Sequence, residues 1–380
     1  MLNLTACGAG RVTPIGTEGL QTAEDEGRIW REARELQSRL DRSALIDEDV
    51  SGYVNQVASK IVPGEVKRAI EVRVKVMKHP APNAFALPHG AVYVHSGFLA
   101  RMDNEAQLAA VLAHEISHII HRHALQTFRN VKQAAAVAST LAVIGAPAGL
   151  PGAGVILLGT VGALAAISGY SQSLEEDADA EGLRLMVNAG YDPGEAVKVI
   201  ENVMRYVEQE EIKEPFFFST HPRLGERQAS YRQLVDTQYK DRGGLQGKAD
   251  FTAKMADVFL DNALLEMARG RYALAHEAIE KSFAVESKNA RAHYLLGELF
   301  RQRALEGDQA RAEKEYQAAI DLEPRFAEPH KGIGLLNYKK GASDLAKRHF
   351  AKYLELNPAA KDRAYIEHYL REIETGRGGP

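Results

Sequence analysis

The sequence predicts two domains of different class: a mostly helical α+β domain with a small β-sheet, then an all-α superhelix. Its 380 residues are enough for two domains. Apolar and polar residues alternate strictly from Ile70 to Lys78, which predicts a strand. Beyond about residue 250 the spacing is helical and the pattern repeats. We therefore expect a short leading segment and two domains, at residues 1–26, 27–245 and 250–376.

Composition excludes several classes of function. The net charge of −4 gives no excess of positive charge for a nucleic-acid partner, so none is expected. The hydrophobic and charged fractions are those of an ordinary globular protein. The single cysteine, Cys7, excludes an internal disulfide and a metal site built from cysteines.

The position of Cys7 carries information of its own. Residues 4–7, LTAC, followed by Gly8, match a bacterial lipobox, in which the cysteine becomes the acylated N-terminus. Only six residues precede it, so the basic and apolar regions of a signal peptide are missing. Two interpretations stay open: lipidation at Cys7 in a chain whose start is set too late or trimmed, and a chance match. The rest of the leading segment is expected to be a tether.

The first domain should begin with two helices and a small sheet. Helical periodicity spans 27–45 and 50–61. After the strand at 70–78, the segment from Asn83 and residues 91–99, AVYVHSGFL, supply a second strand or a hairpin. Asp103 is expected to cap the next helix.

That next helix contains HEISH, from His114 to His118, within the apolar run AQLAAVLAHEISHIIHRHAL, which has no Gly or Pro. Residues four apart lie on one helix face, so His114 and His118 can direct two imidazoles at one ion. Glu115 emerges beside them. This is the His-Glu-x-x-His pattern of zinc peptidases, which supplies two nitrogen ligands and a general base. The alternative is two surface histidines beside an ordinary glutamate.

A catalytic zinc needs a third protein ligand. His121 is seven residues from His114, about 10 Å along the axis at ~1.5 Å per residue, which is too far. The acid-rich run SLEEDADAEGLRLM is the obvious source, because Glu175 and Asp179 lie one turn apart on one helix face. One of the two could bind the metal while the other orients a ligand histidine.

These motifs resemble the metallopeptidase family that includes HtpX and the CAAX prenyl protease, especially its periplasmic, TPR-carrying BepA-like branch. Four motifs occur in the family's order, at residues 83–94, 114–118, 170–179 and 221–227. The resemblance implies a zincin-like metallopeptidase domain with one Zn²⁺ per chain. It assigns Glu175 as the third zinc ligand and Asp179 as its supporting carboxylate. Gln172 stands where many relatives carry Arg.

The resemblance also assigns residues around the metal. His221 and Arg227 would stabilise the oxyanion of the tetrahedral intermediate, where developing negative charge needs donors already in place. His221 could also bind zinc as a fourth ligand and latch the enzyme, which is a hypothesis. An edge strand would pair with an extended substrate backbone. Its substrate-binding residues would be Asn83, Ala84, Phe85 and Ala86.

Residues 134–168 contain no charged side chain. Pro147 and Pro151 divide the stretch into two halves, and neither half reaches the ~20 residues of a membrane span. A buried helical hairpin remains open, as does a hairpin that dips into the membrane or contacts a membrane-protein client. Either could restrict entry to the metal site.

After an expected linker at 241–247, the repeat matches the 34-residue TPR pattern. The first unit, from about Ala256, is weak, with Ser287 in place of Pro, and residues 364–373 would form a capping helix. The matching positions of the second and third units are His293, Leu296, Gly297, Ala312, Tyr316, Ala319 and Pro324, and His330, Ile333, Gly334, Ala346, Phe350, Leu354 and Pro358. Such arrays usually bind proteins.

Two classes of function remain open. The first is a zinc-dependent endopeptidase of the bacterial cell envelope, which acts on unfolded or misassembled outer-membrane proteins with Glu115 as general base. Its TPR array would recruit protein substrates or the outer-membrane assembly machinery, and the resemblance implies a periplasmic, lipid-anchored location at the outer membrane. The second is a TPR adaptor or chaperone for envelope protein assembly with minor or latched proteolysis. The intact motifs favour the first, since an adaptor has no need of Glu115.

Overall fold

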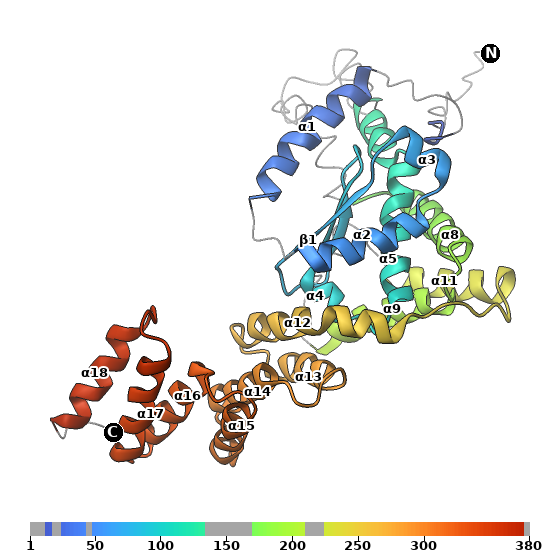
Figure 1. Cartoon of the computed structure of the whole chain (residues 1–380). Coiled ribbons are helices and arrows are strands. Elements are labelled where there is room, and N and C mark those ends of the chain that lie inside the picture. Colours follow the sequence, from blue (N-terminus) through green and yellow to red (C-terminus); the bar gives the residue numbers. More distant parts are fainter. Residues whose placement is uncertain (1–11, 17–23, 43–47, 134–168, 210–223, 376–380) are drawn as a thin grey trace, which may run out of the picture. The chain divides into compact units, whose positions relative to one another are not determined.

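The computed structural model describes residues 12–16, 24–42, 48–133, 169–209 and 224–375 (Figure 1). The chain divides into two compact units, Met1–Lys254 and Met255–Pro380. Several predictions concern residues outside the described ranges: lipidation at Cys7, the apolar stretch at 134–168 and the role of His221.

The first unit has helices around a small sheet, and the predicted fold class is confirmed. Helix α12 (Lys248–Met267) leads from it into the second unit. The other elements of the first unit, in order, are α1 (Glu24–Leu40), α2 (Glu48–Ile61), α3 (Gly64–Ala69), β1 (Arg73–Met77), β2 (Ala84–Ala86), β3 (Ala91–His95), α4 (Ser96–Leu99), α5 (Glu105–Ile120), α8 (Gln172–Asn188), α9 (Gly194–Gln209) and α11 (Leu224–Gln238).

The sheet has three strands in the order β1-β3-β2. Strands β1 and β3 are parallel, with Val74 opposite Val92, and β2 and β3 are antiparallel, with Phe85 opposite Tyr93. The Phe85 and Tyr93 rings stack with their centroids 5.2 Å apart. In the described part of the chain, β2 has a strand neighbour on one side only, as the edge-strand prediction requires.

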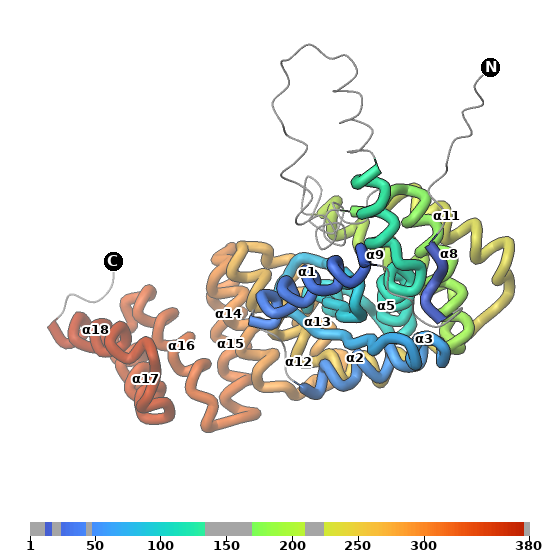
Figure 2. The backbone as a smooth tube through the Cα atoms, turned by 90° about the horizontal axis from the view of Figure 1, so that it is seen from above, coloured from blue at the N-terminus to red at the C-terminus, as the bar shows by residue number. Residues whose placement is uncertain are grey.

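Helix α5, which carries HEISH, is the core of this unit. Every residue from Glu105 to Ile120 is buried, because α2, α8, α9 and the sheet pack around it. Helix α2 runs beside both β1 and α5 (Figures 1 and 2). A helix enclosed on all sides presents any polar side chain to the protein interior, where that side chain needs a partner.

The N-terminal end of α5 is anchored by a buried carboxylate. Glu105 accepts hydrogen bonds from the hydroxyls of Tyr53 and Tyr191, each at 2.6 Å, and from Lys60 Nζ at 2.8 Å. Burial opposes ionisation, but these hydrogen bonds outweigh it and lower the pKa of Glu105. The helix cap is Asn104, whose side chain accepts from the backbone N–H of Gln107, and not Asp103 as predicted.

Three local predictions were wrong. The helical run was expected to continue past residue 120, but Arg122 has φ 55° and a separate helix covers 123–133. Ser96–Leu99 forms the short helix α4 and not part of a strand. The expected linker at 241–247 is packed within the first unit. Leu245 bridges Tyr191, and a Cβ on Gly244 would lie 2.4 Å from the backbone of Tyr191.

The second unit is a series of helical hairpins, as the TPR prediction expects. Gly297 and Gly334, at the positions predicted to be small, leave room for aromatic rings: a Cβ on either would lie 2.6 Å from Tyr316 or Phe350, respectively. Both rings are fully buried. Its further helices are α13 (Tyr272–Phe283), α14 (Ala290–Arg303), α15 (Asp308–Leu322), α16 (Ala327–Lys339), α17 (Ser343–Leu356) and α18 (Arg363–Glu374). Among the helices that the structure describes, none combines the length and the apolar character needed to cross a membrane.

Candidate metal centre

Three buried side chains converge between α5 and α8. The Nε2 atoms of His114 and His118 lie 3.1 Å apart, and each lies 3.5 Å from a carboxylate oxygen of Glu175. One ligand atom from each residue falls within 4.8 Å of the other two. Within the described ranges, this is the one such group of three or more histidine, cysteine or acidic residues.

Close contact between the two helices makes this convergence possible. His114 and His118 are one turn apart on α5, so their rings share a face. Helix α8 approaches that face at Gly182, where a Cβ would lie 3.0 Å from the backbone nitrogen of His114. A larger residue would push α8 outward and carry Glu175 with it.

Asp179 supports His114 from the side away from Glu175. Its Oδ1 lies 2.9 Å from Nδ1 of His114, and Arg227 of α11 donates to the same carboxylate at 2.7 and 3.0 Å. Burial opposes ionisation of Asp179, but the charges and hydrogen bonds of Arg227 and His114 outweigh it and lower the pKa of Asp179. An ionised Asp179 holds the Nδ1–H of His114 and leaves Nε2 for a metal.

The electrostatics favour a cation at this point. Burial and the charge of Arg227 oppose protonation of His114, yet its hydrogen bonds with Asp179 and Glu175 raise the pKa of His114 to about 9. Burial and the nearby carboxylates of Glu115 and Glu175 raise the pKa of Tyr170 well above its usual value. A buried region this rich in carboxylate charge is stabilised by a divalent ion.

Glu115, the next residue after His114, is buried. It lines a pocket whose walls come from α4, α5, α9 and α11 and are mainly apolar. A carboxylate that lies beside the ligand His114 and lines a pocket is placed as a general base requires. The other residues that line this pocket are Phe98, Ala110, Val111, His114, Ala196, Val199, Ile200, Arg227 and Tyr231.

Arg227 does more than was predicted for it. Two of its nitrogens hold Asp179, while Nη1 is buried, lies 3.8 Å from Glu175 Oε2 and makes no hydrogen bond within the described residues. No role was predicted for Tyr231, whose pKa is raised by its burial and by the charge of Asp179. The sequence could have indicated this role, because Tyr231 lies one turn beyond Arg227 on the same face of α11.

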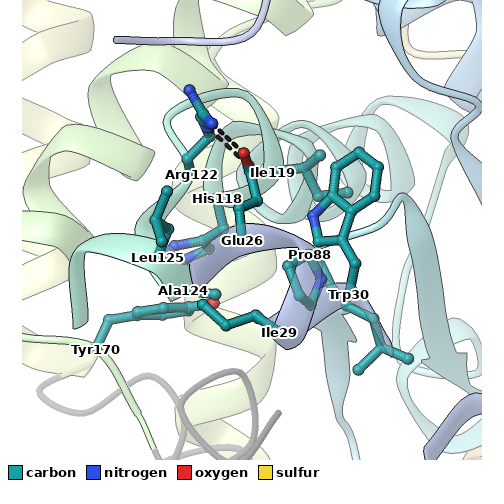
Figure 3. A pocket seen from close by; sticks show the side chains of 12 residues that line it. Glu26, Ile29, Trp30, Pro88, His118, Ile119, Arg122, Ala124, Leu125 and Tyr170 are labelled. Carbon is teal, nitrogen blue, oxygen red and sulfur yellow. Dashed lines mark hydrogen bonds and ion pairs between the residues drawn. The ribbon is translucent and has the colours of Figure 1, made fainter. Parts of the chain in front are cut away.

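His118 is held on two sides by residues that the sequence analysis did not assign. The ring of Tyr170 stacks on it, with centroids 4.1 Å apart and planes 15° apart. His123 contributes Nδ1 at 2.8 Å from Nδ1 of His118. Figure 3 shows His118 and Tyr170 lining a pocket together with Glu26, Ile29 and Trp30 of α1.

The predicted substrate segment lies against α5. Asn83 and the β2 residues Ala84, Phe85 and Ala86 are all buried, and β2 packs on α5. Both polar atoms of the Asn83 amide are buried and make no hydrogen bond within the described part of the chain. A buried amide without partners costs about 1–3 kcal/mol, so its retention is typical of a group that binds a ligand.

The donor set fits zinc. Two imidazole nitrogens and one carboxylate that face one point are the ligand class of catalytic zinc sites. Each histidine has a partner on the nitrogen that points away, as ligand histidines usually do.

Comparison with known proteins gives a consistent result. Residues 48–235 match the model of peptidase family M48. The beta-barrel assembly-enhancing protease of Yersinia pestis is 29% identical over 220 residues, which cover 55% of this chain and 44% of that protein. Its Escherichia coli (strain K12) counterpart is 27% identical over 198 residues, 50% of this chain and 40% of that protein.

A mitochondrial relative matches as well. The mitochondrial metalloendopeptidase OMA1 of Schizosaccharomyces pombe is 34% identical over 170 residues, which cover 45% of this chain and 48% of that protein. The chain therefore spans less than half the length of each of these relatives. The family match begins at residue 48, so helix α1 lies outside it.

Proposed function

This chain carries a domain of peptidase family M48, and from that premise we propose that it is a zinc-dependent endopeptidase of the bacterial cell envelope. The observation that carries the proposal is the convergence of His114, His118 and Glu175 with a buried Glu115 beside them. Its substrates would be unfolded or misassembled outer-membrane proteins.

The residues divide the chemistry between them. Bound at His114, His118 and Glu175, Zn²⁺ would supply Lewis-acid polarisation of the substrate carbonyl and of a water molecule. Glu115 takes a proton from the attacking water and passes it to the leaving amine. Nη1 of Arg227 donates to the carbonyl oxygen as its negative charge develops, and His221 would be a second donor there. Asp179 keeps the ring of His114 in one orientation.

Strand β2 would hold the substrate. An extended peptide can pair with the edge of β2 through backbone hydrogen bonds, which make few demands on side chains. The buried amide of Asn83, directly before β2, has no hydrogen-bond partner among the described residues, which supports a role in binding such a backbone. A folded protein rarely offers an extended segment of this kind, so the arrangement favours unfolded or misassembled chains.

The relatives support a place of action in the cell envelope. Two of them are named beta-barrel assembly-enhancing proteases, which supports outer-membrane proteins as clients of this chain. The helical hairpins of the second unit would recruit those clients or the assembly machinery. A lipid on Cys7 would keep the enzyme at the outer membrane, on its periplasmic side.

The same repeats support a second candidate function, that of an adaptor or chaperone with minor proteolysis. Cleavage of unfolded casein by metal-quantified full-length protein separates the two. We expect wild type to cut, and Glu115→Gln to keep its zinc while its rate falls at least ~100-fold, because the base is lost. Glu176→Gln, an exposed position on α8, is the matched control and should cut at the wild-type rate.

A different outcome would redirect the proposal. If wild type binds one zinc and does not cut, His221→Ala tests whether His221 latches the site. Should that variant also be inactive on casein while holding zinc, the endopeptidase assignment is wrong and the adaptor function takes its place.

A further inference from the structure

The ring of His118 is held by another histidine. Nδ1 of His123 lies 2.8 Å from Nδ1 of His118, and His123 is completely buried. His114, the other histidine of the pair, has the carboxylate of Asp179 in the equivalent place. The two histidines are therefore oriented by chemically different partners.

The direction of the His118–His123 hydrogen bond follows from the metal assignment. Nε2 of His118 faces His114 and Glu175, so this nitrogen must be unprotonated to bind a metal. A neutral imidazole carries one proton, which then sits on Nδ1 of His118. His118 donates this hydrogen bond, and Nδ1 of His123 accepts it.

An unusual turn brings His123 to this place. Helix α5 ends at Ile120, and Arg122 adopts φ 55°, in the left-handed region that residues other than Gly rarely enter. The turn ends α5, and His123, the first residue of the next helix, lies against the ring of His118. A regular helix would place residue 123 on a different face from residue 118.

A segment far away in the sequence holds this turn. Arg122 forms an ion pair with Glu26 of α1, in which Nε donates to Oε1 at 2.8 Å, and its Nη1 donates to the carbonyl of Thr13 at 3.2 Å. The backbone N–H of Ile15 donates to the carbonyl of Ile120 at 2.8 Å, at the end of α5. Glu26 is 2% exposed, and Figure 3 shows its pair with Arg122 beside His118.

We propose that His123 is a positioning residue for the metal ligand His118, and that the Glu26–Arg122 ion pair of the N-terminal segment keeps it in position. The proposal rests on the proposed zinc site and extends it to α1, a helix outside the range matched by the family. The N-terminal segment thereby sets how tightly the centre holds its metal.

The test is the zinc dissociation constant of the full-length protein, measured by competition with a chromogenic chelator. His123→Phe keeps the ring and removes the acceptor, and we expect zinc binding to weaken by ~10–100-fold. His123→Asn restores an acceptor oxygen near the position of Nδ1, and most of the affinity should return. Glu26→Gln removes the charge of the ion pair and should weaken binding by less than His123→Phe.

The second unit offers a matched control. His330 and His349 make the same kind of contact there, with Nδ1 atoms 3.1 Å apart, and neither is a proposed metal ligand. His330→Phe should therefore leave the zinc dissociation constant unchanged. This variant measures how the loss of a histidine–histidine contact outside the metal site affects zinc binding.

The outcomes separate this proposal from the proposed function. If wild type binds zinc and cuts casein while His123→Phe binds zinc equally well, the positioning role is wrong and the peptidase assignment stands. The role is also wrong if His123→Asn is as weak as His123→Phe, because shape would then matter and not the acceptor. If wild type binds no zinc, both fail. Should His123→Phe not fold, an unchanged affinity in Glu26→Gln overturns the proposal.

Discussion

At the N-terminal end of α5 the carboxylate of Glu105 is enclosed by three donors, whereas at the C-terminal end the rings of His114 and His118 face the carboxylate of Glu175. Both ends bury charge in the same helix. At the first end, the carboxylate oxygens of Glu105 accept hydrogen bonds from nearby donors, so this group of residues forms a closed hydrogen-bond network. At the second end, lone pairs from three residues point toward one another, an arrangement that only a proton or a cation can stabilise.

This difference separates an anchor from a reactive centre. A substitution in the closed network around Glu105 should lower the stability of the fold and leave metal binding unchanged. A substitution around the converging ligands should weaken metal binding more than it lowers stability. The following four experiments change one end at a time, from the largest expected effect to the smallest.

Glu105→Ala should destabilise the fold by about 2–3 kcal/mol, because it leaves two buried tyrosine hydroxyls without their acceptor. The exposed Lys60, at 42%, adds little. Chemical denaturation measures the loss, and zinc affinity should not change. A variant that stays as stable as wild type would show that Glu105 is not an anchor.

Asp179→Asn should lower zinc affinity by ~10–100-fold, because a neutral amide holds the Nδ1–H of His114 less firmly. Chelator competition gives the value, with Asp177→Asn, at a half-buried position on the same helix, as a control of equal chemistry. Equal affinities for the two variants would contradict the supporting role of Asp179.

Gly182→Ala should cost about 1–3 kcal/mol and weaken zinc binding, since the new methyl group would lie 3.0 Å from the backbone of His114. Gly52→Ala in α2, where a Cβ meets nothing within 4 Å, should instead stabilise the protein by up to ~1 kcal/mol. Thermal unfolding compares the pair. Equal shifts in the two variants would mean that α8 does not need this close approach.

The anchor should also depend on pH. Because the pKa of Glu105 is lower in the folded protein, its ionised form stabilises the fold fully above its ordinary value of 4.5, and the contribution is lost as pH falls through the lowered pKa. Denaturation of wild type and Glu105→Gln at several pH values measures this. The stability difference should shrink on acidification, and a difference that grows would have the wrong sign.

The sequence predicted what depends on local spacing. A step of four residues placed His114 with His118 and Glu175 with Asp179, and the structure brings the two pairs together. It also predicted the helical hairpins of the second unit. These features repeat along a helix, so periodicity reveals them.

Other features depend on residues far apart in the chain. Nothing near Arg122 indicates a left-handed turn, because the run contains no Gly or Pro and the stabilising partner, Glu26, lies on α1. The role of His123 was missed for the same reason. Asp103 and Asn104 are both good capping residues, and the choice between them depends on how α5 meets its neighbours.

The most direct test of the central claim is a crystal structure of the purified protein with anomalous diffraction data collected at the zinc absorption edge. We predict one zinc ion per chain, ~2.0–2.1 Å from Nε2 of His114 and of His118 and at a similar distance from a carboxylate oxygen of Glu175. Zinc at a different place, or protein that holds none after incubation with the metal, would contradict the account.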